Sequence, residues 1–309
     1  MERIQSIDNA ALHGAYLAVG SFDGLHRGHR YLLEKMAQAA REDGAPSAVL
    51  TFFPHPRAVL GSAPFRYLST LEERLALLEQ IPLDAVILQP FDRAFSAIPA
   101  ETFLRTLKSH LGLHSLWCGP GFSFGYRREG NVEYLANHSI EWGYALYIVP
   151  PLADAHGPIS SSRIRDSLAE GDAVQAAALL GRRYALSGKV VHGAGRGRKM
   201  SIPTANLDVW PEMVVPAHGV YATWAVHEGK RYRSATSVGV RPTFADGRTP
   251  AVTVEAHLLD FDGDLYDATL KVEFVRRLRE ERRFPDSDSL SRQMTEDIEQ
   301  TRRILQEEV

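Results

Sequence analysis

The segment at residues 20–29 has the residue types of an anion-binding loop. Its sequence, Gly-Ser-Phe-Asp-Gly-Leu-His-Arg-Gly-His, follows a short apolar run and precedes a helical pattern. Glycine lets backbone approach a ligand closely, and the N-terminus of a helix favours negative charge. Protonated His26 and His29 could donate hydrogen bonds to phosphate oxygens whose charge grows in a transition state. The candidate residues of this anion site are Gly20, Phe22, Asp23, Gly24, His26, Gly28 and His29.

This loop also fits two roles that need no nucleotide. A glycine-rich turn could simply carry two exposed histidines. A His-x-x-His zinc site is disfavoured, because no third ligand is spaced nearby. Neither Gly-x4-Gly-Lys-Ser/Thr nor Gly-x-Gly-x-x-Gly, two common phosphate-binding strings, occurs in the chain.

Two further segments are expected at the same place. Thr-Phe-Phe-Pro-His-Pro, at 51–56, ends the next apolar run, and Ile-Ser-Ser-Ser-Arg-Ile-Arg, at 159–165, opens a later helix. Parallel strands end at one edge of their sheet, so Pro54 and His55 should face the crevice of the first loop. The three serines could cap their helix, or they could bind a triphosphate together with the arginines. The candidates here are Ser160, Ser161, Ser162 and Arg163.

A second group of candidates lies later in the chain. Gly-Ala-Gly-Arg-Gly-Arg at 193–198 follows a strand-like run and could bind a nucleotide, or be only a mobile basic loop. Pro-Thr-Ala-Asn at 203–206 places a hydroxyl and an amide oxygen two residues apart, on one side of an extended segment. Such oxygens suit Mg²⁺ that bridges nucleotide phosphates, although a proline-initiated turn is the simpler interpretation. The candidates are Gly195, Arg196, Gly197, Thr204 and Asn206.

Glu255 is the candidate general base. In the run 252–258, Val252, Val254, Ala256 and Leu258 alternate onto one face, and Thr253, Glu255 and His257 occupy the other. A solvent-facing strand would show the same pattern. Beside a Mg-ATP site, however, the carboxylate could take a proton from an attacking hydroxyl group.

The elements that must position these residues differ between the two halves of the 309-residue chain. In the first half, apolar runs alternate with helical patterns, which predicts a parallel, doubly wound sheet. The second half has strands without intervening helices, which predicts a small antiparallel barrel with a terminal helix. The fold class is therefore α/β, with domains at 1–183 and 184–309. The expected strands are Tyr16–Val19, Ser47–Phe53, Ala85–Leu88, Ser115–Cys118, Ala145–Val149, Tyr184–His192, Gly219–Val226, Arg233–Val238, Val252–Leu259 and Thr269–Val275, and the expected helices are His29–Arg41, Thr70–Gln80, Glu101–Leu111, Val132–Trp142, Ala173–Leu180 and Ser287–Leu305.

Composition excludes several classes of protein. No apolar run approaches the roughly 18 residues of a membrane span, and no basic-then-apolar leader opens the chain. One cysteine, Cys118, excludes an intrachain disulfide framework and favours a reducing, cytoplasmic setting. The net charge of −3 gives no basic surface for a nucleic acid. The sequence leaves the oligomeric state open.

The motifs together resemble a known enzyme family. Gly-x-Phe-Asp-Gly-x-His-x-Gly-His with Thr-Phe-x-Pro-His-Pro is similar to the FMN adenylyltransferase module of bacterial FAD synthetases. Gly-Arg-Gly-Arg, Pro-Thr-Ala-Asn, Gly-x-Arg-Pro-Thr-Phe at 239–244, Glu255 and the end at 278–284 follow the order of the flavokinase family. Nearly the whole chain therefore resembles a bifunctional riboflavin kinase/FMN adenylyltransferase.

The resemblance implies a six-stranded kinase barrel and two ATP-dependent steps, from riboflavin to FMN and from FMN to FAD. It implies that Thr204 and Asn206 bind Mg-ATP and that Glu255 is the catalytic base. The flavin-binding residues it implies are Pro54, His55, Phe122, Phe124 and Arg279. Two rivals stay open, an enzyme that keeps one of the two activities and a flavin-sensing regulator or carrier without turnover.

Three positions depart from the family pattern. Gly121 stands where an Asp or Asn usually precedes Phe-x-Phe-Gly, so a side chain that could contact nucleotide or flavin is missing. Ser201 and Asp267 stand where glycine is usual. If the backbone there needs a positive φ, these side chains are expected to strain it.

Overall fold

The computed structural model describes residues 1–192, 203–240 and 252–307, which fold into two compact units, Met1–Ser161 and Ser162–Val309. Helix α8 (Ala173–Leu180) packs against the barrel strands β11 (Tyr184–Val191) and β16 (Thr269–Arg279). Packing therefore groups this helix with the barrel, together with most of α7 (Ser161–Glu170). The assignment of domains at 1–183 and 184–309 stays a prediction.

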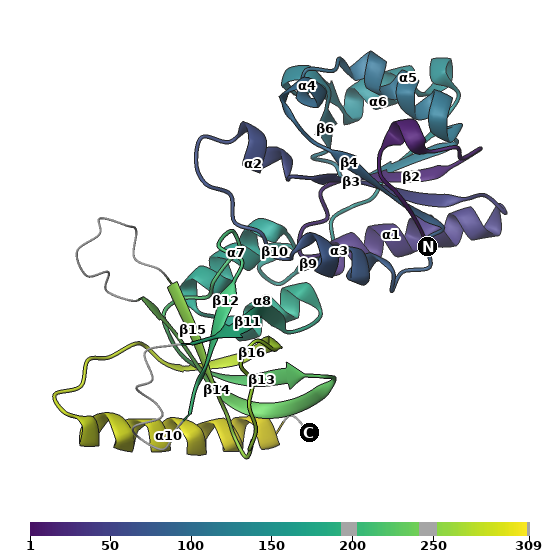
Figure 1. The fold of residues 1–309 in the computed structure, drawn as a ribbon. Coiled ribbons are helices and arrows are strands. Elements are labelled where there is room, and N and C mark those ends of the chain that lie inside the picture. Colours follow the sequence, from purple (N-terminus) through teal and green to yellow (C-terminus); the bar gives the residue numbers. More distant parts are fainter. Residues whose placement is uncertain (193–202, 241–251, 308–309) are drawn as a thin grey trace. The chain divides into compact units, whose positions relative to one another are not determined.

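The first unit is built on a six-stranded parallel sheet in the order β1-β4-β3-β2-β5-β8 (Figure 1). Its central strands are buried over most of their length, as expected for strands covered on both faces. The predicted parallel sheet is thus confirmed, and β1 is a strand that was not expected from the sequence. The strands are β1 (Glu2–Ile4), β2 (Tyr16–Val19), β3 (Ser47–Phe53), β4 (Ala85–Pro90), β5 (Ser115–Cys118) and β8 (Ala145–Ile148), with the short pairs β6 (Ser123–Phe124) with β7 (Gly130–Asn131) and β9 (Ala153–Asp154) with β10 (Gly157–Pro158).

Helices cover both faces of this sheet. One core joins α1 and α3 to a face of β2, β3 and β4, and a second core joins α5 and α6 to the other face. Cys118, at the end of β5, is 1% exposed in the second core, and burial raises the pKa of its thiol to about 11. The helices are α1 (Arg27–Glu42), α2 (Pro56–Leu60), α3 (Leu71–Leu78), α4 (Arg93–Ser96), α5 (Ala100–Leu111) and α6 (Val132–Trp142), with single 3-10 turns at Ile7–Asn9 and Tyr126–Arg128.

The second unit is a closed antiparallel barrel in the order β11-β12-β15-β14-β13-β16. Apolar periodicity predicted five of these strands, whereas β12 was expected only as an extended segment. The terminal helix α10 (Ser287–Gln306) packs against β13 and β14, where Ile304 and Leu305 meet Ala222 and Trp224. The remaining strands are β12 (Ala205–Val209), β13 (Gly219–His227), β14 (Lys230–Val240) and β15 (Val252–Leu258).

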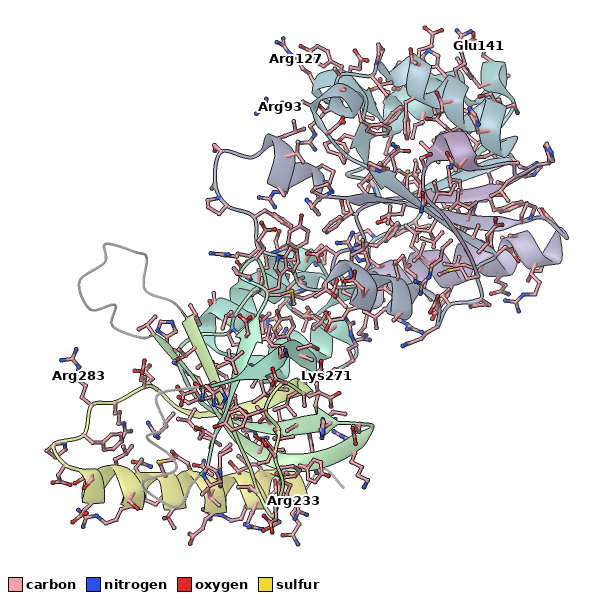
Figure 2. The ribbon with its side chains drawn as sticks, viewed as in Figure 1. Arg93, Arg127, Glu141, Arg233, Lys271 and Arg283 are labelled. Carbon is pink, nitrogen blue, oxygen red and sulfur yellow. The ribbon has the colours of Figure 1, made fainter. Side chains whose placement is uncertain are left out.

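Most charged side chains lie on the outside of their unit, as Arg93, Glu141 and Lys271 do (Figure 2). Among the described residues, three charged side chains of Asp, Glu, Lys or Arg are buried instead. Asp23 and Arg74 lie together in the first unit, and Asp297 lies on α10 of the second. Charged groups are rarely buried without partners, so the surroundings of each of these three side chains matter.

Candidate active sites

The loop at residues 20–26 is a tightly packed connection between β2 and α1. Gly24 has φ +75°, and a Cβ atom there would lie 2.8 Å from the Cβ of Leu68, so both conformation and space require glycine. His26 caps α1, because its Nδ1 accepts the backbone N–H of His29 at 3.2 Å. The ring of Phe22 meets that of His29 edge-on at 5.2 Å. The loop is therefore shaped by short-range contacts around the start of one helix.

The two histidines form one stacked pair rather than two exposed side chains. Their ring centroids are 3.6 Å apart, and His26 is only 5% exposed. Burial and then the neighbouring charges of His26 and Arg74 lower the pKa of His29 well below its ordinary value. The suggested role of protonated His26 and His29 as donors in the transition state stays a prediction beside this lowered pKa of His29. A neutral imidazole still donates one N–H, and the helix N-terminus supplies the positive potential.

The three predicted segments of the first site meet at this loop. Thr51 Oγ1 donates to the carbonyl oxygen of Ser21 at 3.1 Å, and Ser161 Oγ donates to that of Asp23 at 3.0 Å. Ser161 thus ties its segment to the loop instead of acting only as a cap. Ser160 precedes it in the same unit, whereas Ser162 and Arg163 belong to the second unit, and their part in this site stays a prediction.

The carboxylate of Asp23 accepts hydrogen bonds from backbone N–H groups of the segment before α3. It accepts the N–H groups of Leu68 at 3.1 Å and Ser69 at 3.3 Å, and Ser69 Oγ in turn accepts the N–H of Gly24 at 3.1 Å. These contacts hold the loop at residues 20–26, the candidate nucleotide loop, against the segment before α3. The predicted role of Asp23 in nucleotide binding stays a prediction beside this structural one.

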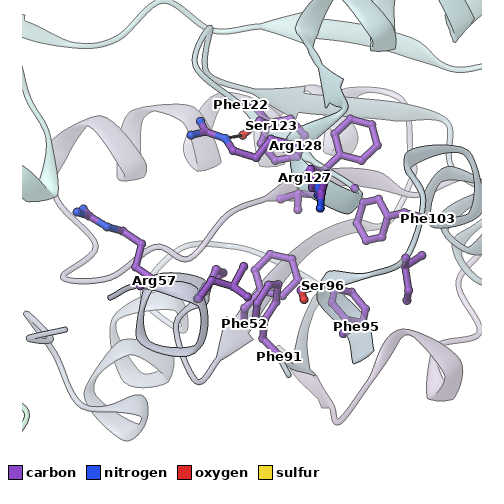
Figure 3. A pocket seen from close by; sticks show the side chains of 17 residues that line it. Phe52, Arg57, Phe91, Phe95, Ser96, Phe103, Phe122, Ser123, Arg127 and Arg128 are labelled. Atoms are coloured by element: carbon purple, nitrogen blue, oxygen red, sulfur yellow. Dashed lines mark hydrogen bonds between the residues drawn. The ribbon is translucent and has the colours of Figure 1, made fainter. Parts of the chain in front are cut away.

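An aromatic pocket of about 510 Å³ lies in the first unit (Figure 3). It contains two of the predicted flavin residues, Phe122 and Phe124, whose rings stack with centroids 5.5 Å apart. Pro54 and His55 are not among its lining residues, and the His55 ring stacks on Phe65 at 4.1 Å. Sequence reasoning missed the other side chains that define the pocket, which are Phe52, Phe91, Phe95 and Phe103, with Arg57, Arg127 and Arg128 at charged positions.

The pocket has a polar side. Figure 3 shows the guanidinium groups of Arg57 and Arg128 extending to the same side of the view, to the left. Arg128 Nε donates to Ser123 Oγ at 2.8 Å, which fixes that side chain. Arg127 and Arg128 both have positive φ, at 51° and 63°, in a 3-10 turn. An apolar pocket with cationic side chains at one side suits a flat aromatic ligand that carries an anionic tail.

The candidate kinase residues lie on one face of the barrel wall. Asn206 of β12 is directly opposite Glu255 of β15, which is directly opposite Ser237 of β14. Residues opposite each other in antiparallel strands have Cβ atoms about 4.5–5.5 Å apart on the same face. The amide of Asn206 and the carboxylate of Glu255 are therefore neighbours. Thr204 is half-buried just before β12.

The predicted alternation along β15 is confirmed with one exception. Val254, Ala256 and Leu258 are buried, and Glu255 and its polar neighbours are half-exposed. Val252, expected on the buried face, is 47% exposed instead, because it lies at the end of the strand. Alternation places the polar side chains on the outside of the closed barrel, since the buried set fills the interior.

Arg279 is engaged by the terminal helix. Its guanidinium binds both carboxylate oxygens of Asp297, with Nη2 and Oδ2 2.8 Å apart, and it lies over the ring of Phe284. A flavin-binding role for Arg279 stays a prediction. The predicted residues Gly195, Arg196 and Gly197 lie outside the described residues, as does the departure at Ser201.

The other two departures differ in their effect. Asp267 has φ 63°, which confirms that the backbone adopts the left-handed region there. Aspartate tolerates this region better than most residues, and its carboxylate pairs with Lys189 Nζ at 2.8 Å. Apart from Gly121 and its two neighbours in the chain, no described residue has an atom within 4 Å of a Cβ placed on Gly121, so the missing side chain leaves open space.

No group of three His, Cys, Asp or Glu side chains in the described ranges could hold a metal ion. Thr204 and Asn206 offer neutral oxygens, and the nearby Glu255 offers one carboxylate. This donor set fits a Mg²⁺ ion that keeps most of its ligands from nucleotide phosphates and water.

Comparison with known proteins identifies relatives over the whole length. The FAD synthetase family model matches residues 8–163, and the riboflavin kinase model matches residues 180–305. Bifunctional riboflavin kinase/FMN adenylyltransferases are 35% identical in Escherichia coli (strain K12), over 95% of this chain and 94% of theirs, and 36% identical in Haemophilus influenzae, over 97% of each.

One solved structure covers both units. It is described as a macrolide-efflux protein from Streptococcus pneumoniae, is 32% identical, and covers 97% of this chain and 98% of its own with a TM-score of 0.88. Within the described residues, no helix has the length and apolar character needed to cross a membrane. Because the two family models together match most of the chain and these relatives are at least 35% identical over at least 95% of it, the chain belongs to the family of bifunctional riboflavin kinases/FMN adenylyltransferases.

Proposed function

We propose that each unit carries one of the two activities of the family. The barrel phosphorylates riboflavin with ATP to give FMN and ADP, and the parallel-sheet unit adenylylates FMN with a second ATP to give FAD and pyrophosphate. The observation that carries the kinase assignment is the cross-strand pair of Asn206 and Glu255. It places a candidate base beside a candidate nucleotide ligand.

In the kinase step, Glu255 takes the proton of the riboflavin 5′-hydroxyl while that oxygen attacks the γ-phosphorus of ATP, and ADP leaves. An alcohol needs such a base because it is almost fully protonated at pH 7. Thr204 and Asn206 would hold the magnesium ion that arrives with the nucleotide. When bound, Mg²⁺ neutralises charge on the transferring phosphate.

In the adenylylation step, the FMN phosphate attacks the α-phosphorus of ATP and pyrophosphate leaves. A phosphate is already an anion at pH 7, so this site needs no base and depends on alignment and charge stabilisation. His26 and His29, the loop glycines and the start of α1 face the triphosphate. Ser160 and Ser161 complete its binding within this unit, and the nucleotide-binding roles of Ser162 and Arg163 stay predictions.

The aromatic pocket takes the flavin ring of FMN. Phe122 and Phe124 contact its faces, and the guanidinium groups of Arg57 and Arg128 lie on the side where polar atoms of the flavin emerge. Pro54 and His55 lie next to Pro56 and Arg57, which line the pocket, so they border the flavin rather than enclose it. The substrates are small molecules, and a reducing cytoplasm fits the single buried thiol of Cys118.

The test is to incubate the purified chain with riboflavin, ATP and Mg²⁺ and to separate FMN from FAD by chromatography. Sequential appearance of FMN and then FAD, abolished by EDTA, supports both activities. Product from only one step, with FMN supplied separately, supports the single-activity alternative. Flavin binding without release of ADP or pyrophosphate supports a regulator or carrier and contradicts the proposal.

A further inference from the structure

Arg74 is a buried cation on a helix that the adenylylation mechanism does not use. It is 0% exposed, among the largest fully buried side chains of the chain. On α3 it shares the buried side with Leu75 and Leu78, where a hydrophobic residue would be expected. Replacing a buried ion pair by well-packed apolar side chains is often neutral or stabilising, so burial alone does not account for an arginine here.

The guanidinium of Arg74 lies between the two ligand sites of the first unit. Nη1 donates to the carbonyl oxygen of Phe52 at 3.1 Å, at the end of β3, and Phe52 lines the aromatic pocket. Nη2 is 3.9 Å from Asp23 Oδ1, in the nucleotide loop. Arg74 therefore touches the end of the strand that borders the flavin and the loop that precedes the histidines.

The rest of this guanidinium is incompletely satisfied. Among the described residues, Nε and Nη2 of Arg74 are buried without a hydrogen-bond partner, and so is Nδ1 of His29. Buried donors of a charged group are costly to leave unpaired. Because the guanidinium of Arg74 lies beside Asp23 of the loop at residues 20–26, its unpaired nitrogens indicate that the charge is kept for its effect on that loop.

The charge of Arg74 acts on His29. The groups that influence the protonation of His29 are His26, from its own loop, and Arg74, from α3, while Asp23 lies beside Arg74 as its counter-charge. After burial and His26, Arg74 contributes to lowering the pKa of His29. This fixes His29 as a neutral ring, with one donor and one acceptor nitrogen, before substrate arrives.

We propose that Arg74 is a positioning residue for adenylyl transfer, which joins the end of β3 to the nucleotide loop and holds a positive charge beneath the histidine pair. The proposal rests on the function proposed above. It predicts that removing the charge of Arg74 lowers kcat strongly and changes substrate affinity little, because the ligands still bind but their reacting atoms are less well aligned.

The test compares Arg74→Met and Arg74→Gln, which are neutral, with Arg74→Lys, which keeps the charge. Arg41→Met, an exposed arginine on α1, is the matched control. Two measurements are made on each variant: the kcat and KM of FAD formation from FMN, and the pKa of His29 in the ligand-free protein by NMR. Thermal unfolding and riboflavin phosphorylation by the other unit report whether the chain remains folded.

We expect both neutral variants to lose about tenfold or more in kcat with at most about a threefold change in the KM for ATP. We expect the pKa of His29 to rise by about half a unit or more, because a nearby like charge is gone. Arg74→Lys should keep the low pKa of His29 and recover part of kcat. Arg41→Met should resemble the parent protein.

A purely structural role would lower only the unfolding temperature, leave the pKa of His29 in place and make Arg74→Lys no better than Arg74→Gln. That result overturns the proposal. If Arg74→Met does not fold, Arg74→Gln, which can still donate to the Phe52 carbonyl, decides it. Failure of the parent chain to form FAD would overturn the proposed function instead, and the NMR comparison would still test whether Arg74 acts on His29.

Discussion

Both units transfer a group from ATP, a phosphoryl group in one and an adenylyl group in the other, but their candidate sites are built on very different backbone structures. In the first unit, the candidate site is the start of a helix, with two stacked histidines and a nearby carboxylate, Asp23, that binds backbone N–H groups. In the barrel, it is a row of side chains on adjacent strands, with a half-exposed carboxylate at its centre. The nucleophile accounts for the difference, since a phosphate needs alignment and charge stabilisation and an alcohol also needs a base.

The largest effect is expected at the helix start. His29→Ala removes a donor that would stabilise charge developing at the α-phosphate, so FAD formation from FMN should fall by about 10²- to 10³-fold. Riboflavin phosphorylation should persist. Steady-state assays of both steps check this, with the exposed His156→Ala as control. FAD synthesis near the parent rate would contradict the assignment, and loss on zinc chelation with Mg²⁺ in excess would point to a metal site.

Glu255→Gln tests the other half of the comparison. The amide keeps the shape of the carboxylate without its basicity, so FMN formation should fall by about 10²-fold or more while FAD formation from supplied FMN survives. The matched control is Glu212→Gln, an exposed glutamate in the same unit. Unchanged phosphorylation of riboflavin would remove Glu255 from the mechanism.

A smaller effect is expected for Asn206→Ala. Losing one neutral oxygen beside Glu255 should lower kinase turnover by about tenfold and raise the Mg²⁺ concentration needed for half-maximal rate, because nucleotide phosphates still hold the ion. Activity is measured against Mg²⁺ at fixed ATP, with exposed Asn137→Ala as control. Tight Mg²⁺ binding to the ATP-free protein, measured by calorimetry, would show instead that the protein binds the metal on its own.

The smallest effect is expected at Asp267, outside both sites. Asp267→Gly relieves the left-handed backbone but loses the contact with Lys189, so the unfolding midpoint at pH 7 should move by only about 2 °C or less. The hydrogen bond and charge of Lys189 lower the pKa of Asp267 in the folded state. The stability that this pair contributes is therefore present above the ordinary carboxyl pKa and is lost as the pH falls through the lowered pKa of Asp267. Lowering the pH should therefore raise the stability of Asp267→Gly relative to that of the parent protein. A large loss of stability at pH 7 would contradict this.

Local patterns made much of this architecture predictable. The glycines and histidines of 20–29 lie within ten residues, and the start of α1 is fixed by contacts inside that segment, such as the His26 cap. Alternation along β15 placed Glu255 correctly. The short strand β12 was predicted only as an extended segment, because its register comes from pairing with β11, the strand before it, and with β15, three strands later in the chain.

The missed site residues depend on long-range packing. The phenylalanines of the pocket come from several elements, and only Phe91 and Phe95, four residues apart, carried a local sign of a shared face. Arg74 did leave a signal, because it falls on the apolar stripe of its helix. The lowered pKa of His29 depends on burial, on His26 and on Arg74, which is 45 residues away in the chain, so no local pattern indicates it.

The buried thiol of Cys118 makes the chain a convenient background for site-specific labelling. At neutral pH a thiol with a pKa of about 11 is almost entirely protonated, and maleimides react with the thiolate. Cys118 should therefore not react with a maleimide label. A cysteine introduced at an exposed position, such as Ile140, which is 93% exposed on α6, would then be the residue that takes the label. One such cysteine in each unit would accept a pair of fluorophores and report the distance between the units during turnover.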